Sequence, residues 1–297
     1  MKIVVTGSLG NISKPLTEEL VQKGHEVIVI SSKPERQKDI EALGATAAIG
    51  SMEDVPFLTT AFSGADAVYT MIPRPHFTNP DFDAMAYWSK LVDNYAQAIK
   101  QSGVKCVVHL SSIGAHMEKG SGLIIGHHNA EVVLGNLQNV NITFMRPVGF
   151  YYNLLNYIPA IKSTGGIALN YGADDMIPWV SPIDIAAVIT EEIVKPLSGR
   201  KILYAASQEL TCNEVASILG AAIGKPDLKW TLITNELMLS AYELFGMPKA
   251  IATGLTEMQA SMHSGEFYND YYLHQPALGN VKLKEWAKEF AAVYNQK

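Results

Sequence analysis

The first thirteen residues of the chain contain the feature that most restricts its fold. Residues Lys2 to Thr6 form an apolar, β-branched run of the kind found in buried parallel strands. Gly7 and Gly10 follow directly and let the backbone turn tightly without a Cβ in the way. A helical pattern then runs from about Asn11 to Lys23. A strand, a glycine turn and a helix in this order predict the opening unit of a parallel α/β sheet.

The same unit predicts a nucleotide site, because the backbone N–H groups at such a helix start suit a pyrophosphate. The next apolar run, Val27 to Ile30, ends in Ser31, Ser32 and Lys33, with Arg36 close behind. A carboxylate at this place would select NAD, whereas hydroxyl and basic groups accommodate the 2′-phosphate of NADP. We therefore predict NADP(H) as the cofactor. The alternative interpretation is a solvated loop with ordinary charges.

Strand and helix patterns alternate through the first half of the chain, which predicts a doubly wound, Rossmann-type parallel sheet. The strand patterns are Ile3–Thr6, Val27–Ile30, Thr46–Ile49, Ala67–Ile72, Cys106–Leu110 and Ile142–Met145. The helical patterns between them are Pro34–Leu43, Val55–Phe62, Phe82–Gln101 and His127–Leu137. We expect a nucleotide-binding domain over residues 1–149 and a smaller C-terminal substrate lobe over residues 150–297, with residues 178–206 returning to the first domain.

Composition narrows the class of protein. The chain has 297 residues, of which 48% are hydrophobic, and a net charge of −6, so we expect a soluble globular protein without a nucleic-acid surface. The strand that begins at residue 2 leaves no room for a signal peptide, and no apolar run approaches the ~20 residues of a membrane span. Cys106 and Cys212 form no metal-binding spacing. We therefore expect a cytoplasmic protein that uses neither a metal nor a membrane, and leave a homodimer open.

Six segments stand in an order and spacing typical of one protein family, namely Thr6–Ser13, Phe62–Tyr69, Val107–Ser112, Phe144–Asn153, Val180–Ala186 and Leu210–Ala216. Together they resemble the NmrA-like group of atypical short-chain dehydrogenases/reductases. The first is similar to the Gly-x-x-Gly-x-x-Gly fingerprint, with Ser13 in the place of the third glycine. The group includes NADPH-dependent quinone and triphenylmethane-dye reductases, and also catalytically silent NADP-sensing regulators.

The resemblance implies a cofactor site along the carboxyl edge of the sheet. Its expected members are Thr6, Gly7, Leu9, Gly10, Asn11, Ile12, Ser31, Ser32, Lys33, Arg36, Met71, Ile72, Pro73 and Arg74. Residues from Met71 onward would border the nicotinamide end. Arg74 would meet a phosphate or the substrate, with a solvated arginine as the alternative.

The catalytic pattern departs from that of typical short-chain reductases, which use a serine after the fifth strand and a Tyr-x-x-x-Lys pair on the next helix. Ser112 fits the serine, but His127 stands in the place of the tyrosine and Glu131 in that of the lysine. The four-residue spacing puts His127 and Glu131 on one helical face, where the carboxylate would favour a proton-donating imidazolium. The alternative is that the catalytic pair has been lost and that His127 and His128 are ordinary polar residues.

The segments expected to form the substrate pocket are rich in aromatic residues, which suits a flat, conjugated acceptor. The expected contacts are Phe150, Tyr151, Tyr152, Asn153 and Trp179. The alternative is that most of these rings belong to the hydrophobic core. The leading hypothesis is an NADPH-dependent reductase that delivers hydride to a quinone-like or other conjugated small molecule. The second hypothesis is a non-enzymatic NADP(H) sensor that acts through a protein partner.

Overall fold

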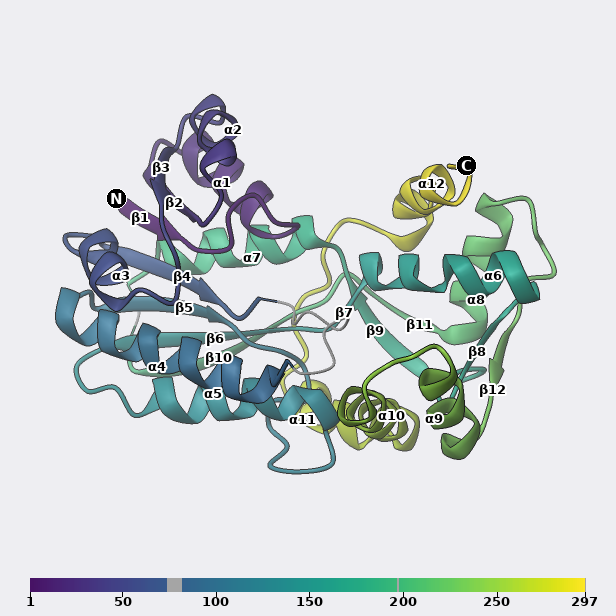
Figure 1. Cartoon of the computed structure of the whole chain (residues 1–297). Helices are drawn as coiled ribbons and strands as arrows, with labels where there is room; N and C mark the ends of the chain where they lie inside the picture. The colour runs from purple at the N-terminus through teal and green to yellow at the C-terminus, as the bar shows by residue number, and fades with distance from the viewer. Residues whose placement is uncertain (74–81, 197, 297) are drawn as a thin grey trace.

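The computed structural model describes residues 1–73, 82–196 and 198–296, and these ranges contain a seven-stranded sheet with neighbours in the order β10-β6-β5-β4-β1-β2-β3 (Figure 1). Each strand runs parallel to its neighbour. The strands are β1 (Lys2–Val5), β2 (Glu26–Ser31), β3 (Thr46–Ile49), β4 (Ala67–Met71), β5 (Cys106–Leu110), β6 (Asn141–Pro147) and β10 (Arg200–Ala205). The predicted α/β class with a doubly wound parallel sheet is confirmed.

Helices cover both faces of this sheet (Figure 1). One face carries α1 (Ser13–Gln22), α2 (Gln37–Ala42) and α7 (Pro182–Ile193), and the other carries α3 (Val55–Phe62), α4 (Ala84–Ser102) and α5 (Ile125–Gly135). Short 3₁₀ turns, η1 (Pro34–Arg36) and η2 (Gly122–Ile124), precede α2 and α5. Helix α4 begins with the Asp83 carboxylate accepting a hydrogen bond from the Ala86 N–H, and it ends at Gly103 in the left-handed conformation.

The strand order reverses direction between β1 and β4. From β1 the chain builds outward through β2 and β3, and then returns to place β4, β5 and β6 on the other side of β1. In sheets of this kind, ligands bind beyond the carboxyl ends of the strands at the point of reversal. The topology therefore predicts a ligand site at the loops that follow β1 and β4.

The C-terminal part lies beyond the carboxyl ends of these strands (Figure 1). It contains two small sheets among the described residues, one with the order β11-β9-β7 and the other pairing β12 with β8. Its elements are β7 (Gly149–Phe150), η3 (Tyr151–Tyr157), α6 (Ile158–Thr164), β8 (Ile167–Leu169), β9 (Met176–Val180), β11 (Gln208–Thr211), α8 (Cys212–Ala222), β12 (Trp230–Leu232), α9 (Asn235–Leu244), α10 (Lys249–Ser264), η4 (Glu266–Tyr268), α11 (Asn269–Leu273) and α12 (Leu283–Tyr294).

The chain crosses between the two parts more than once. Strand β9 lies in a small sheet, whereas α7 packs on α1 and β10 pairs with β6 at the edge of the large sheet. The segment that returns to the large sheet thus begins at α7, a few residues later than residue 178. The division of the chain into domains stays a prediction.

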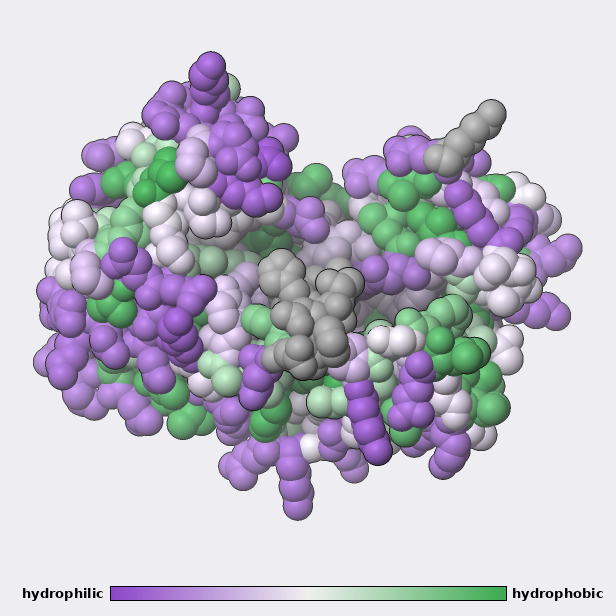
Figure 2. Space-filling model, in the orientation of Figure 1, coloured by the Kyte–Doolittle hydropathy of each residue, from purple (hydrophilic) through white to green (hydrophobic). Residues whose placement is uncertain are grey.

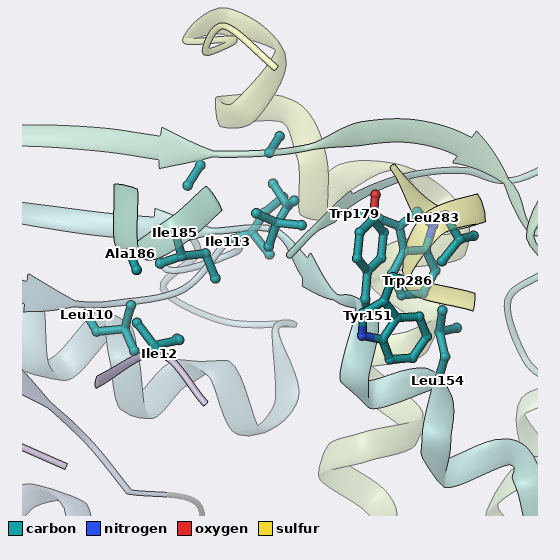
Figure 3. Close-up of a cluster of buried hydrophobic side chains, with 14 of the residues drawn as sticks. Ile12, Leu110, Ile113, Tyr151, Leu154, Trp179, Ile185, Ala186, Leu283 and Trp286 are labelled. Atoms are coloured by element: carbon teal, nitrogen blue, oxygen red, sulfur yellow. The ribbon is translucent and has the colours of Figure 1, made fainter. Parts of the chain in front are cut away.

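A continuous hydrophobic core joins the two parts. It runs from Ile12 and Leu110 under α1, past Ile113 and Ile185, to Trp179 and the C-terminal helices (Figure 3). A separate cluster fills the other face of the sheet under α3, α4 and α5. Because the first core spans both parts, the C-terminal part is packed against the sheet over a broad apolar contact.

Candidate functional site

The loop after β1 is a tight glycine turn at the point of strand reversal. Gly7 and Ser8 have φ angles of +89° and +56°, and the Gly10 N–H donates to the Gly7 carbonyl at 3.2 Å. A Cβ on Gly7 would stand 2.8 Å from Ser13 Oγ and 3.2 Å from Met71 Cγ. Ser13 thus occupies the space next to the turn, and its hydroxyl donates to the Thr6 carbonyl at 2.9 Å. Only a glycine fits position 7 without strain.

The turn leaves backbone donors free at the start of α1. Among the residues that the structure describes, the N–H groups of Leu9, Asn11 and Ile12 have no hydrogen-bond acceptor, and no side chain caps the helix. Free N–H groups and the positive end of the helix dipole together attract an anion. The predicted residues are therefore brought together in an arrangement that fits a pyrophosphate.

The end of β2 lies beside the glycine turn. The Ser8 hydroxyl donates to Ser31 Oγ at 2.9 Å, and the Ser8 N–H donates to the Ile30 carbonyl. Ser31 is buried, whereas Ser32 and Lys33 are exposed. Arg36 is also exposed and forms an ion pair with Asp39 at 3.1 Å. Surface pairs of this kind are weak, so the Arg36 guanidinium stays available to a ligand.

The end of β4 forms the other side of the point of reversal. The Tyr95 hydroxyl donates to the Met71 carbonyl and the Trp88 indole N–H donates to the Pro73 carbonyl, each at 2.9 Å. Both donors come from α4, which therefore holds the backbone after β4 in place. Ile72 is largely buried. Arg74 lies outside the described residues.

Ser112 and its neighbour Ser111 follow β5 and have different environments. Ser112 is partly exposed, and its carbonyl accepts from the Ala115 N–H. Ser111 is buried, and its hydroxyl donates to Glu131 Oε1 at 2.5 Å. The partly exposed position of Ser112 is compatible with its predicted contact to a substrate, and that contact stays a prediction.

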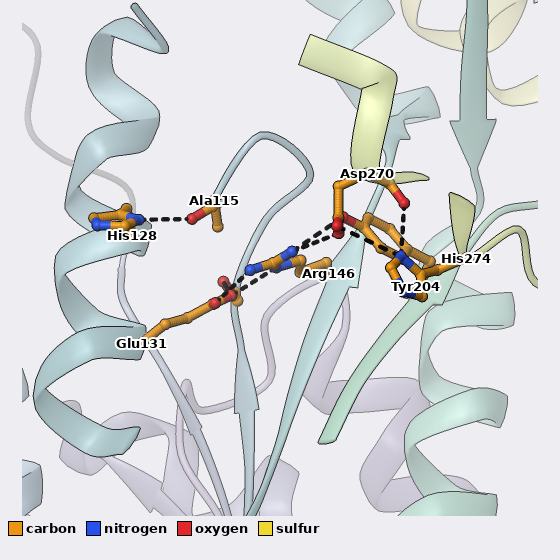
Figure 4. A network of polar contacts seen from close by, with 8 residues as sticks. Ala115, His128, Glu131, Arg146, Tyr204, Asp270 and His274 are labelled. Carbon is orange, nitrogen blue, oxygen red and sulfur yellow. Dashed lines mark hydrogen bonds and ion pairs between the residues drawn. The ribbon is translucent and has the colours of Figure 1, made fainter. Parts of the chain in front are cut away.

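Glu131 belongs to an ion network that joins the two parts of the molecule (Figure 4). Arg146 Nε and Nη2 donate to the two oxygens of Glu131 at 2.8 and 2.6 Å. Arg146 Nη1 donates to Asp270 on α11 at 2.8 Å, and the Tyr204 hydroxyl donates to the same Asp270 oxygen at 2.5 Å. Burial alone would lower the pKa of the Arg146 guanidinium. The hydrogen bonds from Arg146 to Glu131 and the negative charge of Glu131 outweigh this effect, so the pKa of Arg146 is raised.

The predicted pairing of Glu131 with His127 is therefore wrong. The Glu131 carboxylate is committed to Arg146 and Ser111. Burial lowers the pKa of His127 to about 4, which is opposite to the predicted imidazolium. His128, the next residue on α5, has its ring Nδ1 3.0 Å from the Ala115 carbonyl (Figure 4). A ring with a pKa this low does not act as a cationic acid near pH 7.

The ion network borders a surface hollow of about 490 Å³ between α5, β6, β10 and α11. His116 and His128 lie on its wall, together with apolar side chains of Val132, Phe144 and Ile202. The hollow is thus formed by α5 and the edge of the sheet, not by the glycine turn. On the face shown in Figure 2, the surface is also notched between the part that carries α1 and α2 and the part that carries α12.

Burial of a neutral histidine makes folding sensitive to acid. His109 on β5 is fully buried, and burial lowers its pKa from 6.5 to about 3. Between these values the unfolded chain binds a proton here that the folded chain does not, so stability falls as pH falls. From pH 7 to pH 5 the wild type should lose about 2 kcal/mol more than a His109→Gln variant, in urea unfolding at both values. Equal losses would contradict this assignment.

The aromatic residues proposed for the substrate pocket divide into two groups. Tyr151 is fully buried, stacks on Trp286 at 5.7 Å and donates its hydroxyl to the Val281 carbonyl. Trp179 is 2% exposed and lies in the same core (Figure 3). The structure therefore gives Tyr151 and Trp179 a packing role in place of the predicted contact with substrate.

The remaining residues of that segment are partly exposed. Phe150 and Tyr152 stack with ring centroids 4.8 Å apart, and Asn153 follows them on η3. Because β7 continues from the carboxyl end of β6, this stacked pair lies close to the edge where the strands end. Their contact with a substrate stays a prediction.

Several residues of this region were not anticipated from sequence. Arg146 offered a signal, because it is a charged residue that directly follows the apolar strand pattern Ile142–Met145. A buried positive charge requires partners, so the position of Arg146 indicated that carboxylates lie nearby. Asp270 offered no such signal, since it lies 124 residues away on a different element.

Among the described residues, no group of three or more histidine, cysteine or acidic side chains is arranged to hold a metal ion. Within the same ranges, no helix combines the length and the apolar character that crossing a bilayer requires.

The chain is similar in sequence or in fold to several known proteins. An NAD(P)H azoreductase from Xenophilus azovorans is 28% identical over 261 residues, which cover 87% of this chain and 86% of the relative. An NADPH-dependent quinone oxidoreductase from Escherichia coli, solved with NADPH, superposes with a TM-score of 0.80 at 20% identity, covering 97% of this chain and 99% of its own. The Citrobacter sp. triphenylmethane reductase, solved with NADP(H), gives a TM-score of 0.77 at 20% identity with the same coverage.

The sequence also matches a family model over almost its whole length. Residues 1–289 fit the model of the NmrA-like family, and this confirms the resemblance drawn from the motifs. The match includes both the glycine turn and the C-terminal part that carries Asp270. The chain belongs to the NmrA-like family.

Proposed function

We propose that the chain binds NADP(H) across the point of strand reversal. The free N–H groups of Leu9, Asn11 and Ile12 would hold the pyrophosphate, and the positive φ of Gly7 lets the backbone approach it closely. Relatives of the same fold were solved with NADPH or NADP(H), which supports the proposal. When bound, the cofactor supplies hydride.

The end of β2 would set the preference for the phosphorylated cofactor. Replacing Ser32 by Asp and Lys33 by Ala puts a carboxylate where a 2′-phosphate would lie and removes the nearby positive charge. The dissociation constant for NADPH should then rise at least about tenfold more than that for NADH, since a like-charge contact costs more than ~1.4 kcal/mol. Equilibrium titration of both nucleotides measures the ratio.

Lys38 offers a matched control, because it is another exposed lysine close by on α2. Lys38→Ala removes a positive charge without touching the end of β2, and it should leave the ratio of the two constants unchanged. An unchanged ratio in the Ser32→Asp, Lys33→Ala variant would refute the assignment of NADP(H).

We further propose that the protein is a reductase whose acceptor is a quinone-like or other conjugated small molecule. The observation that carries this proposal is the replacement of the Tyr-x-x-x-Lys pair. The Glu131 carboxylate is bound to Arg146, and desolvation of its ring lowers the pKa of His127 to about 4. Reduction of a simple carbonyl needs a strong proton donor, whereas a conjugated acceptor can take hydride first and a proton from water later. The azoreductase, quinone oxidoreductase and dye reductase relatives support this class of acceptor.

The protein would contribute position and a partly apolar surface. The stacked rings of Phe150 and Tyr152 offer a flat wall, and Asn153 offers a hydrogen-bonding group beside it. Ser112 lies after β5 and would hold the polar end of the acceptor. The C-terminal part would exclude water from this region.

A kinetic screen tests the proposal against the sensor hypothesis. NADPH oxidation is followed with quinones, azo dyes and triphenylmethane dyes, for wild type, His127→Ala and Asn153→Ala. We expect turnover with at least one acceptor class and a higher KM for it in Asn153→Ala. Tight NADPH binding without turnover on any acceptor would refute the reductase and favour a sensor that acts through a protein partner.

A further inference from the structure

Helix α4 presents two hydrogen-bond donors to the backbone that follows β4. The indole N–H of Trp88 donates to the Pro73 carbonyl and the hydroxyl of Tyr95 donates to the Met71 carbonyl, each at 2.9 Å. Trp88 is 6% exposed and Tyr95 is fully buried, so both donors are shielded from water. Two of three consecutive carbonyls therefore have fixed directions, and the proline ring fixes φ at residue 73.

Trp88 also packs against the start of α5. Its ring contacts that of His127 with centroids 5.8 Å apart. A Cβ on Gly126 would stand 2.3 Å from Trp88 Cε3, so a glycine is needed there for the indole to lie this close to the helix. One side chain thus fixes the separation between the segment after β4 and α5.

Tyr95 holds the part of this segment that borders the glycine turn. A Cβ on Gly7 would stand 3.2 Å from Met71 Cγ, so the residue that Tyr95 fixes packs directly beside the turn. The Tyr95 hydroxyl oxygen is also 2.9 Å from Met52 Sδ, but a thioether is a weaker acceptor than a carbonyl. The Met52 carbonyl accepts separately from the Asn94 amide at 3.4 Å. Removing the Tyr95 hydroxyl therefore releases Met71 and leaves the backbone of Met52 held.

The order of the strands indicates which half of the cofactor this segment would meet. The glycine turn after β1 would hold the pyrophosphate, and the end of β2 would hold the phosphorylated ribose of the adenosine half. Strands β2 and β4 lie on opposite sides of β1. The nicotinamide half would therefore extend over the carboxyl end of β4, beside residues 71–73. This step rests on the proposed binding of NADP(H).

We propose that Trp88 and Tyr95 are positioning residues for the nicotinamide half of the cofactor. Through the carbonyls of Pro73 and Met71 they fix the backbone beside which this half lies, and Trp88 also sets its separation from α5. Both side chains act through the backbone that they hold and not on the reacting atoms. Hydride transfer depends steeply on the approach of donor and acceptor, and a shift of about 1 Å can cost on the order of 100-fold in rate. Two hydrogen bonds from one long helix prevent such a shift.

Equilibrium binding of two nucleotides to the full chain tests the proposal. NADPH contains the nicotinamide half, whereas 2′,5′-ADP has the same 2′-phosphate and lacks the nicotinamide. Trp88→Phe and Tyr95→Phe each remove one donor and keep an aromatic ring in place. Each should raise the dissociation constant for NADPH roughly threefold to tenfold, which corresponds to one hydrogen bond, and should leave that for 2′,5′-ADP unchanged.

Tyr87 offers a matched control on the same helix. It is partly exposed, its ring packs against Phe82, and within the described residues it donates to neither carbonyl. Tyr87→Phe should change neither dissociation constant.

A rate measurement separates positioning from a loss of folded protein. With a productive acceptor, single-turnover NADPH oxidation should slow roughly tenfold in Trp88→Phe and in Tyr95→Phe. The rate is expressed per NADPH-binding site counted by titration, so a smaller folded fraction does not lower it. An unchanged rate per site would overturn the positioning role.

The binding outcomes are equally distinct, and either variant alone suffices. Equal changes for the two nucleotides, or no change for either, would overturn the proposal. A wild-type protein that binds neither nucleotide would instead refute the proposed cofactor site. The expected binding pattern in a protein that turns over no acceptor would refute the reductase function and leave the positioning of the nicotinamide half standing.

Discussion

Replacing Arg146 by leucine is expected to lower the free energy of unfolding by about 3–5 kcal/mol. The Arg146 side chain is 4% exposed, and those of Glu131 and Asp270 are 11% and 21% exposed. Removing the guanidinium leaves Glu131 nearly buried without its counter-charge, and it leaves Asp270 with the Tyr204 hydroxyl and without its cation. Most of the lost stability comes from leaving carboxylates buried without a counter-charge, and less comes from the loss of the hydrogen bonds themselves. Urea or guanidinium unfolding at neutral pH measures it.

Two further variants identify the cause. The double variant Arg146→Leu, Glu131→Gln also removes the negative charge of residue 131, so it should lose less stability than Arg146→Leu alone. Arg36→Leu breaks the exposed Arg36–Asp39 pair and should change stability by no more than about 1 kcal/mol. A double variant as unstable as Arg146→Leu would show that burial of an unpaired carboxylate is not the cause.

Gly122→Ala is expected to destabilise the protein by about 2–5 kcal/mol. Gly122 begins η2 with φ of +54°, and a Cβ there would overlap the carbonyl oxygen of Gly254 on α10. That obstacle is backbone and cannot rotate away, so α10 must move from η2. The expected loss of stability has two parts: the strain of a left-handed backbone at a residue that carries a Cβ, and the repacking of the close contact between η2 and α10. Chemical unfolding gives the size of the loss.

Gly120 provides the matched control. It also has a positive φ, of +78°, but a Cβ there meets only Met117 Cε at an ordinary 3.7 Å. Gly120→Ala should therefore show the conformational strain alone, about 1–2 kcal/mol. Equal losses in the two variants would indicate that the approach of α10 to η2 contributes nothing.

Local patterns predicted the elements of the sheet part well. The predicted boundaries of β3, β5 and α3 agree with the structure, because each segment is a short apolar run bounded by turn residues. The helical pattern over Pro34–Leu43 divides instead into η1 and α2. Helix α5 begins at Ile125, before the predicted His127, since the preceding glycines and serine give no clear start signal.

Residues that act through local backbone geometry could also be predicted. The glycine turn needs positive φ angles and free N–H groups, and both follow from a few consecutive residues. Residues that act through partners on other elements could not. The sequence does not distinguish Tyr151 and Trp179 from Phe150 and Tyr152, because all four are aromatic. Only packing against Trp286 and its neighbours places Tyr151 and Trp179 in the core.

The sequence by itself determined the sheet, the nucleotide-binding turn and the family, because strand patterns, glycine positions and motif order are properties of neighbouring residues. Only the tertiary structure decided the partners of Glu131 and His127. The helical spacing allowed them to meet each other, but Arg146 arrives from β6 and offers Glu131 two charge-assisted hydrogen bonds. For His127, desolvation without a counter-charge lowers the pKa of the ring and so favours its uncharged form.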